Sequence, residues 1–331
     1  MAIPQRDFGQ TGLRVSRLGL GLAALGRPGY INLGHSADLN GGYTPEAMRS
    51  GLHTVLDVAW AVGIRYVDAA RSYGRAEEFL GDWLRSRQPD QIVVASKWGY
   101  TYTAGWQVNA EVHEVKDHSL PVLQRQWCET QSYLGDWLRI YQVHSATLDS
   151  GVFTNQSVLS ELAKLKAQGL LIGLSVSGHQ QPQTIEYAAS ILVDGVRLFD
   201  CVQATWNLLE TSAAAALAAA HELGLSVIVK EALANGRLTS RNREPSFAAR
   251  RQRLTQEAER LNTTPECLAL AAAIAQPWAD VVLSGAATPD QIRSNAAAFD
   301  VAWDELTAER LSSLAEDPRL YWETRSRLAW N

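Results

Sequence analysis

The sequence predicts an α/β protein, a (β/α)8 TIM barrel with an N-terminal β-hairpin cap, and three observations support this prediction. Short apolar runs alternate with helical patterns along the chain, each of eight runs is followed by a helix, and turn residues precede the first run. Apolar runs of this length suit parallel strands that are covered on both faces, because such strands need not alternate apolar with polar residues.

The expected strands are 15–22, 66–70, 92–97, 138–144, 171–176, 200–205, 225–230 and 280–285. The expected helices are 44–62, 75–87, 117–135, 155–168, 180–192, 211–223, 264–275 and 288–298. Before the first strand, "RDFGQTGLRVSRLG" places the turn residues "GQTG" between two apolar stretches. This pattern predicts a hairpin that caps the lower end of the barrel.

A doubly wound open sheet is the alternative fold, and it requires a glycine-rich phosphate turn directly after an early strand. The segment "LGLGLAALG" contains Gly19, Gly21 and Gly26, but their spacing differs from that fingerprint and no helix begins directly behind them. The barrel is therefore preferred. Since no linker or block of like charge interrupts the chain, we expect one domain over 1–331.

The composition describes an ordinary globular protein of 331 residues, with 46% hydrophobic and 20% charged residues. A net charge of −5 argues against nucleic acid or an anionic membrane surface as a partner. The three cysteines lack metal-ligand spacing, so no metal site is expected. No secretion signal and no apolar run of membrane-spanning length is found, which favours a soluble cytoplasmic protein.

Polar side chains stand at the carboxyl ends of the expected strands, where the active site of such a barrel lies. Asp68 ends the second strand and Tyr73 follows in the loop, while Lys97 and His144 end the next two strands. Each residue alone has an ordinary structural explanation, such as surface exposure or core packing. Their convergence at one rim indicates a site.

The combination favours a particular chemistry. A tyrosine hydroxyl has a pKa of about 10, and a nearby ammonium favours its phenolate form. We expect Lys97 to lower the pKa of Tyr73, Asp68 to anchor Lys97, and His144 to orient a carbonyl oxygen by hydrogen bonding. Because no nucleophile, metal cluster or glycosidase-like carboxylate pair accompanies them, a hydride cofactor is implied.

These residues lie in motifs that resemble those of the aldo-keto reductase family. The matching motifs, in order, are "FGQTGLRVSRLGLG", "GIRYVDAARSYGRAEEFLGDWL", "VVASKWG", "LRIYQVH", "GLLIGLSVS", "CVQATWNLLE", "ANGRL" and "LSGAATPDQIRSN". The resemblance covers residues 5 to 315 approximately. It implies a (β/α)8 barrel that binds NADP(H) without a Rossmann domain, with Tyr73 as general acid and Asp68, Lys97 and His144 as its partners.

The resemblance also implies binding residues. Ser175 and Gln203 would hold the nicotinamide carboxamide, residues 284–295 would carry the adenosine phosphates with Asn295 at the adenine, and loops around three tryptophans would shape the substrate pocket. The implied cofactor-binding residues are Gly21, Leu22, Ser175, Gln203, Lys230, Leu233, Gly236, Leu238, Ser284, Gly285, Ala287, Gln291, Ser294 and Asn295, and the implied substrate-binding residues are Trp98, Trp106 and Trp206.

Three departures from the family pattern bear on the cofactor. Val176 stands where an asparagine commonly follows the serine, and Lys230 stands where an aromatic residue often stacks on the nicotinamide, a part for which Trp206 is the candidate. In the last motif Gly285, Ala286 and Gln291 stand where NADPH-selective members often have basic or hydroxyl groups, and Arg293 is the cation left. NADP(H) is the expected cofactor, with NAD(H) as the alternative.

Three functions remain open. The first is a reductase that converts aldehydes, ketones, ketoaldehydes or aldoses to alcohols. The second is an NAD(P)+-dependent sugar or aldose dehydrogenase, and the third is a redox-sensing binding subunit. The partner of the first two is a small carbonyl compound or its alcohol, and the protein is expected as a monomer or a small homo-oligomer.

Two segments have two interpretations each. The basic run 241–253 is expected as a solvated insertion, or as a loop that folds over the cofactor pyrophosphate with Arg241 or Arg243. The segment 317–330, rich in Tyr, Trp and Arg, is expected to close over the active site or to form an oligomer contact.

Overall fold

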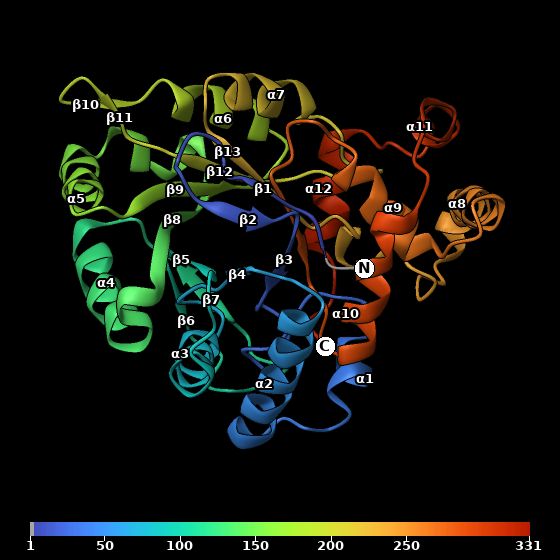
Figure 1. The fold of residues 1–331 in the computed structure, drawn as a ribbon, viewed down its shortest axis with the longest axis horizontal. Coiled ribbons are helices and arrows are strands. Elements are labelled where there is room, and N and C mark those ends of the chain that lie inside the picture. The colour runs from blue at the N-terminus through green and yellow to red at the C-terminus, as the bar shows by residue number, and fades with distance from the viewer. Residues whose placement is uncertain (1–2) are drawn as a thin grey trace.

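Eight parallel strands close into a barrel in the computed structural model, which describes residues 3–331. Around the barrel the strands follow chain order and every neighbouring pair is parallel, so the predicted fold class is confirmed (Figure 1). The barrel strands are β3 (Leu18–Gly21), β4 (Tyr66–Asp68), β5 (Val93–Trp98), β8 (Leu138–Ala146), β9 (Leu171–Val176), β12 (Cys201–Thr205), β13 (Ser226–Lys230) and β14 (Val281–Ser284).

The predicted N-terminal hairpin is present, but it takes part of what was expected to be the first barrel strand. Strand β1 (Gln5–Asp7) pairs antiparallel with β2 (Arg14–Ser16), and β3 begins only at Leu18. The expected strand 15–22 is therefore wrong at its start. The Ser16 hydroxyl redirects the chain, because it donates to the Leu18 carbonyl at 2.6 Å and accepts from the Arg65 amide at 2.7 Å.

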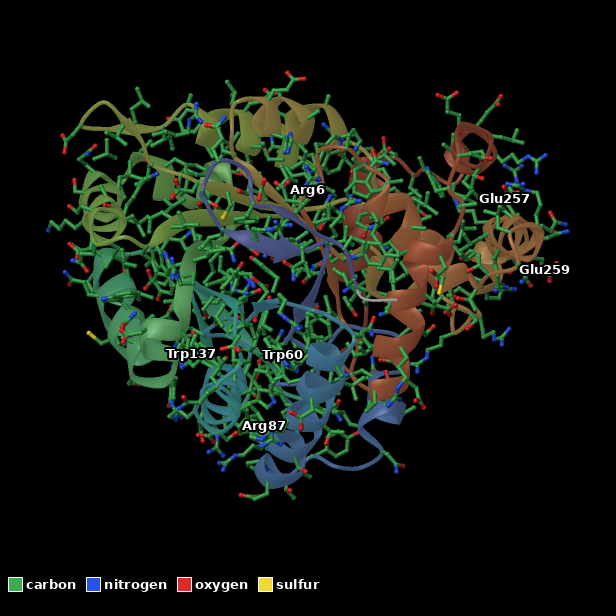
Figure 2. The ribbon with its side chains drawn as sticks, viewed as in Figure 1. Arg6, Trp60, Arg87, Trp137, Glu257 and Glu259 are labelled. Atoms are coloured by element: carbon green, nitrogen blue, oxygen red, sulfur yellow. The ribbon has the colours of Figure 1, made fainter. Side chains whose placement is uncertain are left out.

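The hairpin closes the end of the barrel where the strands begin. Phe8 and Val15 are fully buried and pack in one cluster with Tyr66, Val93 and Val281, which stand at the starts of three barrel strands. Arg6, labelled on the hairpin in Figure 2, lies 3.1 Å from the buried Asp280 carboxylate just before β14. With this end filled, the open end is the one where the strands finish.

Each barrel strand is followed by a helix on the outer face, as predicted. These helices are α2 (Pro45–Ala61), α3 (Ala76–Arg87), α4 (Leu120–Leu134), α5 (Gln156–Ala167), α6 (Gln181–Ala189), α7 (Ala214–Glu222), α9 (Pro265–Ile274) and α10 (Pro289–Ala296). Three of them begin with Thr-Pro: the hydroxyls of Thr44, Thr264 and Thr288 accept from backbone amides three residues later at 3.2, 3.2 and 3.3 Å. No helix in 3–331 is both long and apolar enough to cross a bilayer.

Several elements lie outside the repeating pattern. They are α1 (His35–Leu39), α8 (Ala248–Arg260), α11 (Glu305–Ser312), α12 (Pro318–Ser326) and the strand pairs β6 (Tyr100–Tyr102) with β7 (Glu114–Lys116) and β10 (Leu192–Val193) with β11 (Val196–Arg197). Short 3-10 turns occur at Gly135–Trp137, Leu148–Ser150, Val152–Thr154, Ala234–Gly236, Pro245–Phe247 and Ala297–Asp300.

The basic run 241–253 is not wholly a solvated insertion, because from Ala248 onward it forms helix α8. Glu257, labelled on α8 in Figure 2, contacts Arg260 at 2.6 Å and Arg310 of α11 at 3.3 Å. The helix is thus tied to α11 at the periphery of the molecule (Figure 1).

Candidate active site

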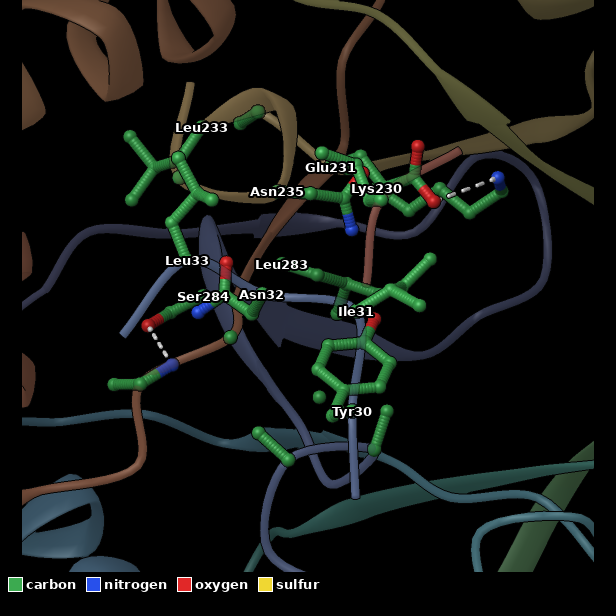
Figure 3. A pocket seen from close by; sticks show the side chains of 18 of the residues that line it. Tyr30, Ile31, Asn32, Leu33, Lys230, Glu231, Leu233, Asn235, Leu283 and Ser284 are labelled. Atoms are coloured by element: carbon green, nitrogen blue, oxygen red, sulfur yellow. Dashed lines mark hydrogen bonds and ion pairs between the residues drawn. The ribbon is translucent and has the colours of Figure 1, made fainter. Parts of the chain in front are cut away.

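A cavity of about 610 Å³ opens where the barrel strands end. Its wall includes the last residues of four strands, Gly21, Asp68, Lys230 and Ser284, and also Gln203, which lies within β12. Its volume is within the range of small-molecule and cofactor sites. Figure 3 shows the wall, with Lys230 and Glu231 on one side and Leu33 and Ser284 on the other.

The structure brings Asp68, Tyr73 and Lys97 into direct contact. Both members of the ion pair between Lys97 and Asp68 are almost fully buried, with side-chain exposures of 0% and 2%. The same ammonium donates to the Ala69 carbonyl at 3.0 Å and to the Tyr73 hydroxyl at 3.2 Å. The phenol therefore contacts a fixed cation on the cavity wall.

Tyr73 reaches this position through a tight turn after β4. Its amide donates to the Ala70 carbonyl at 3.0 Å, and Gly74 follows with a φ of +60°. A Cβ at Gly74 would stand 2.5 Å from the Gly26 carbonyl oxygen, which is too close for any side chain. The glycine thus lets the two loops touch and turns the phenol toward the cavity.

His144 lies beside the phenol at the end of β8. Its ring centroid is 5.5 Å from that of Tyr73 in an edge-on arrangement, and its Nδ1 lies 3.4 Å from the Ser72 hydroxyl. Burial, followed by the positive charges of Lys97 and Arg27, holds the pKa of His144 well below its usual value. The imidazole is therefore neutral near pH 7 and carries a single N–H that can donate to a ligand.

The second oxygen of Asp68 is held by two buried amides. Gln142 and Gln203 donate to it at 3.0 and 3.1 Å. The carboxylate is thus satisfied on both oxygens, by an ammonium on one side and by glutamines on the other. Gln203, which the family resemblance assigns to the nicotinamide, also serves this internal network.

The pKa of Tyr73 departs from the prediction made from the sequence. It lies well above its ordinary value, because burial and then the negative charge of Asp68 disfavour the phenolate, with Arg27 acting in the opposite direction. The expected lowering by Lys97 is offset because Asp68 compensates the ammonium in direct contact. Tyr73 therefore holds its proton firmly, as a proton donor must.

Most of the implied cofactor-binding residues line the cavity. Those on its wall are Gly21, Ser175, Gln203, Lys230, Leu233, Gly236, Ser284, Gly285, Gln291, Ser294 and Asn295. Leu22, Leu238 and Ala287 are not on the wall; the two leucines are fully buried in the core, and the Ala287 amide donates to Gln291 Oε1 at 2.7 Å. Two of the wall residues join β14 to α10, since Asn295 donates to the Ser284 hydroxyl at 2.8 Å (Figure 3).

The three tryptophans expected at the substrate pocket are absent from the cavity wall. Trp98 is fully buried and packs edge-on against His118, with the ring centroids 5.6 Å apart. Trp206 packs edge-on against Trp278, with the ring centroids 5.9 Å apart. Trp106 turns its indole N–H to the Tyr43 carbonyl at 2.6 Å. All three stabilise the shell around the site.

Other aromatic and charged residues form the wall instead. Arg27 lies 5.4 Å from the ring of Tyr73 and 4.7 Å from the ring of Trp330, and it contacts Glu114 at 2.8 Å. Tyr30 also lines the cavity, where burial raises its pKa. The sequence analysis missed Arg27, Tyr30 and Glu114, because no motif or strand end marks them.

The segment 317–330 closes over the cavity, as one of its two interpretations predicted. Arg325 of α12 donates to Glu231 at 3.0 Å, and Trp330 stacks on His113 with ring centroids 3.8 Å apart. Asn331 and Tyr30 exchange two backbone hydrogen bonds of 3.1 Å. Although burial opposes it, the charges of Arg325 and Lys230 hold the pKa of Glu231 at about 2. In the sequence, the Tyr, Trp and Arg residues of this segment had indicated that it closes over the site.

Comparisons with known proteins identify the family to which the chain belongs. Residues 17–316 match the sequence pattern of the Aldo/keto reductase family, and the chain belongs to that family. It is 26% identical to the pyridoxal 4-dehydrogenase of Microbacterium luteolum over 94% of this chain and 99% of the relative. It is 24% identical to the NADH-specific methylglyoxal reductase of Escherichia coli K12 over 93% of this chain and 97% of that protein.

The fold is also that of a solved structure. The holo form of an aldo-keto reductase from Bacillus halodurans superposes with a TM-score of 0.74, at 21% identity, over 95% of this chain and 97% of that one. The family is one of oxidoreductases that use nicotinamide cofactors, so this chain is placed in that enzyme class.

Proposed function

We propose that this protein interconverts a small carbonyl compound and its alcohol with a nicotinamide adenine dinucleotide, and that Tyr73 is the general acid. The observation that carries the proposal is the contact of the Tyr73 hydroxyl with the Lys97 ammonium, 3.2 Å away, on the wall of the cavity. Lys97 is in turn fixed by Asp68. Proton donation from a positioned side chain accelerates such reactions by about 10²–10⁴-fold.

The residues of this chain divide the work at the carbonyl oxygen. Tyr73 gives its phenolic proton to that oxygen as the carbon gains a hydride, so the C=O double bond becomes C–OH and C–H. Neutral His144 donates a hydrogen bond to the same oxygen, which stabilises the negative charge that develops there. Lys97 stabilises the phenolate that remains on Tyr73 until solvent returns a proton.

The cavity suits the dinucleotide that supplies the hydride. Ser175 and Gln203 stand beside the acid on the wall, and Leu233, Gly236 and the turn after β14 extend the wall away from it. A Cβ built on Gly285 would meet no atom within 4 Å, so the backbone there faces open cavity and can be approached closely by a phosphate. When bound, the reduced cofactor supplies a hydride to the carbonyl carbon.

The cheapest test follows the absorbance of the reduced cofactor with methylglyoxal or 4-nitrobenzaldehyde as substrate. We expect turnover by the wild-type protein and a loss of about 10²–10⁴-fold in kcat/KM for Tyr73→Phe. Tyr187→Phe is the matched control, because Tyr187 is 46% exposed on α6 and outside the cavity wall. Unchanged turnover in Tyr73→Phe would sink the mechanism.

A second candidate is the oxidative direction, with an aldose or another sugar as the alcohol. The relatives support it by their names, since one is called a dehydrogenase and another a reductase on a similar share of the chain. The same residues serve both directions, because Tyr73 as phenolate can accept the proton that it otherwise donates. Initial rates with NAD+ and a panel of aldoses, set against the carbonyl panel, distinguish the two.

A further inference from the structure

A group of side chains far along the cavity wall from Tyr73 has no part in the chemistry above. We call Asp38, Arg241, Glu266 and Gln291 the distal cluster. Arg241, Glu266 and Gln291 line the cavity next to Ser294 and Asn295, and Asp38 of α1 lies behind them with its side chain 5% exposed. On the proposed function, this is where the adenosine half of the cofactor lies.

The Asp38 carboxylate accepts hydrogen bonds from two side chains, those of Arg241 and Gln291. Arg241 donates to both of its oxygens, at 2.6 and 2.7 Å, and Gln291 donates to Oδ1 at 2.9 Å. Oδ1 therefore has two donors and Oδ2 has one. Since Asp38 lies behind the cavity wall, its part is to compensate the charge of Arg241 and to hold Gln291 in place.

Asp38 compensates the charge of Arg241 in direct contact. Besides its two bonds to Asp38, its Nη1 also lies 3.4 and 3.3 Å from the carbonyl oxygens of Leu33 and Gly34. The other cations that the structure places on the cavity wall, Arg27, Lys230 and Arg325, surround the catalytic end. Arg293 of the last motif is 58% exposed, pairs with Asp290 and does not reach the wall.

The charge of the distal cluster is thus negative. One guanidinium stands against the carboxylates of Asp38 and Glu266, and the Ser240 amide and hydroxyl bind Glu266 at 2.7 Å without adding charge. A ribose 2′-hydroxyl is a donor that a carboxylate accepts, whereas a 2′-phosphate brings further negative charge and needs a free Arg or Lys. Cavities for NAD(H) and NADP(H) differ in this respect.

We infer that the distal cluster, in which Asp38 compensates Arg241 and holds Gln291, makes this enzyme select NAD(H) over NADP(H). The inference rests on the proposed function, because it assigns the ribose of the same cofactor to the distal cluster. It reverses the cofactor expected from the family resemblance. It also assigns a role to the short helix α1, which no motif marks.

Binding, rather than turnover, tests the inference. NADH and NADPH are titrated into the wild-type protein and into Asp38→Asn, with quenching of tryptophan fluorescence as the signal, and the ratio of the two Kd values is compared. We expect wild type to bind NADH at least about tenfold more tightly, and Asp38→Asn to reduce that ratio at least about fivefold. The control is Asp290→Asn, which removes an exposed carboxylate from α10 and should leave the ratio unchanged.

Other results decide against the inference in different ways. Equal affinity of wild type for the two nucleotides, or tighter NADPH binding, overturns the assignment of Asp38 and leaves the proposed function intact. Binding of neither nucleotide overturns both. If Asp38→Asn does not fold, Gln291→Arg adds a cation at the same place, and NADPH affinity should then rise relative to NADH; an unchanged ratio also contradicts the inference.

Discussion

Asp68 lies on the cavity wall and Asp38 lies behind it, and each is fixed by a cation together with one or two glutamine side chains. Asp68 takes Lys97, Gln142 and Gln203, and both charges are buried to within 2% exposure. Asp38 takes Arg241 and Gln291, and the Arg241 side chain is 40% exposed. The same arrangement of charges is therefore built at a buried strand end and at a short helix whose cationic partner is partly exposed.

The difference lies in what each pair can do. Because water is excluded around Asp68 and Lys97, their charges act strongly on the neighbouring phenol. Around Asp38 the guanidinium is partly hydrated, so the pair orients a carboxylate and adds little to stability. We therefore expect the first pair to serve chemistry and folding, and the second to serve recognition.

The largest expected effect comes from removing the cation of each pair. Lys97→Met leaves the Asp68 carboxylate buried and unpaired, and such changes cost about 3–5 kcal/mol of unfolding free energy. In Arg241→Met the Asp38 carboxylate keeps its bond from Gln291, and water can enter the place of the guanidinium because the Arg241 side chain is 40% exposed, so a loss of about 1 kcal/mol or less is expected. Urea unfolding at pH 7 measures both.

In Lys97→Met, Gln142 and Gln203 still donate to Asp68, so we expect a loss near the lower end of the range of about 3–5 kcal/mol. Lys164→Met, at a lysine 69% exposed and paired with Glu161, controls for the loss of a surface charge. Equal losses in Lys97→Met and Arg241→Met would break the distinction between the two pairs.

The same contrast explains what could be predicted from the sequence. Asp68, Lys97 and His144 end apolar runs, and since parallel strands of a barrel finish at one rim, their convergence follows from the strand pattern alone. The first strand was misjudged because Val15 and the apolar residues from Leu18 onward were taken as one strand across Ser16 and Arg17, where the hydrogen bonds of the Ser16 hydroxyl redirect the chain.

Asp38 had no such signal. It stands on a five-residue helix in a long connection after β3, and its partner Arg241 follows β13, so their contact depends on loop paths that hydrophobic periodicity does not encode. The pKa of Tyr73 was also beyond reach, because burial decides its direction and the sequence does not state burial.

A middle-sized effect is expected at Lys230, a cavity-wall cation whose nearest carboxylate, Glu231, is 3.8 Å away and already bound by Arg325. Burial lowers the pKa of Lys230 to about 8. Between pH 8 and about 10.5 the unfolded chain therefore binds more protons at this lysine than the folded protein does. The stability contributed by this site rises with pH across that window, by roughly 3 kcal/mol.

Urea unfolding of wild type and Lys230→Met at pH 7.5 and pH 10 measures this contribution of Lys230 to the free energy of unfolding. Groups common to both proteins cancel in the difference, so the stability of wild type relative to the variant should increase at the higher pH. A difference that stays constant or falls would show that Lys230 keeps an ordinary pKa.

The smallest expected effect concerns the aromatic wall of the catalytic end. Trp330 stacks on His113 and lies over Arg27, contacts worth about 0.5–1.5 kcal/mol each, so Trp330→Ala should lower the melting temperature by a few degrees at most. Because this ring is on the cavity wall, the same variant should raise KM for the carbonyl substrate about two- to tenfold at saturating cofactor, with kcat nearly unchanged. Trp206→Phe is the counterpart, since its ring packs against Trp278 away from the wall and should leave KM as it is. If instead Trp206→Phe raised KM and Trp330→Ala did not, the substrate would lie against Trp206, as the family resemblance suggested. Segment 317–330 would then not shape the substrate pocket.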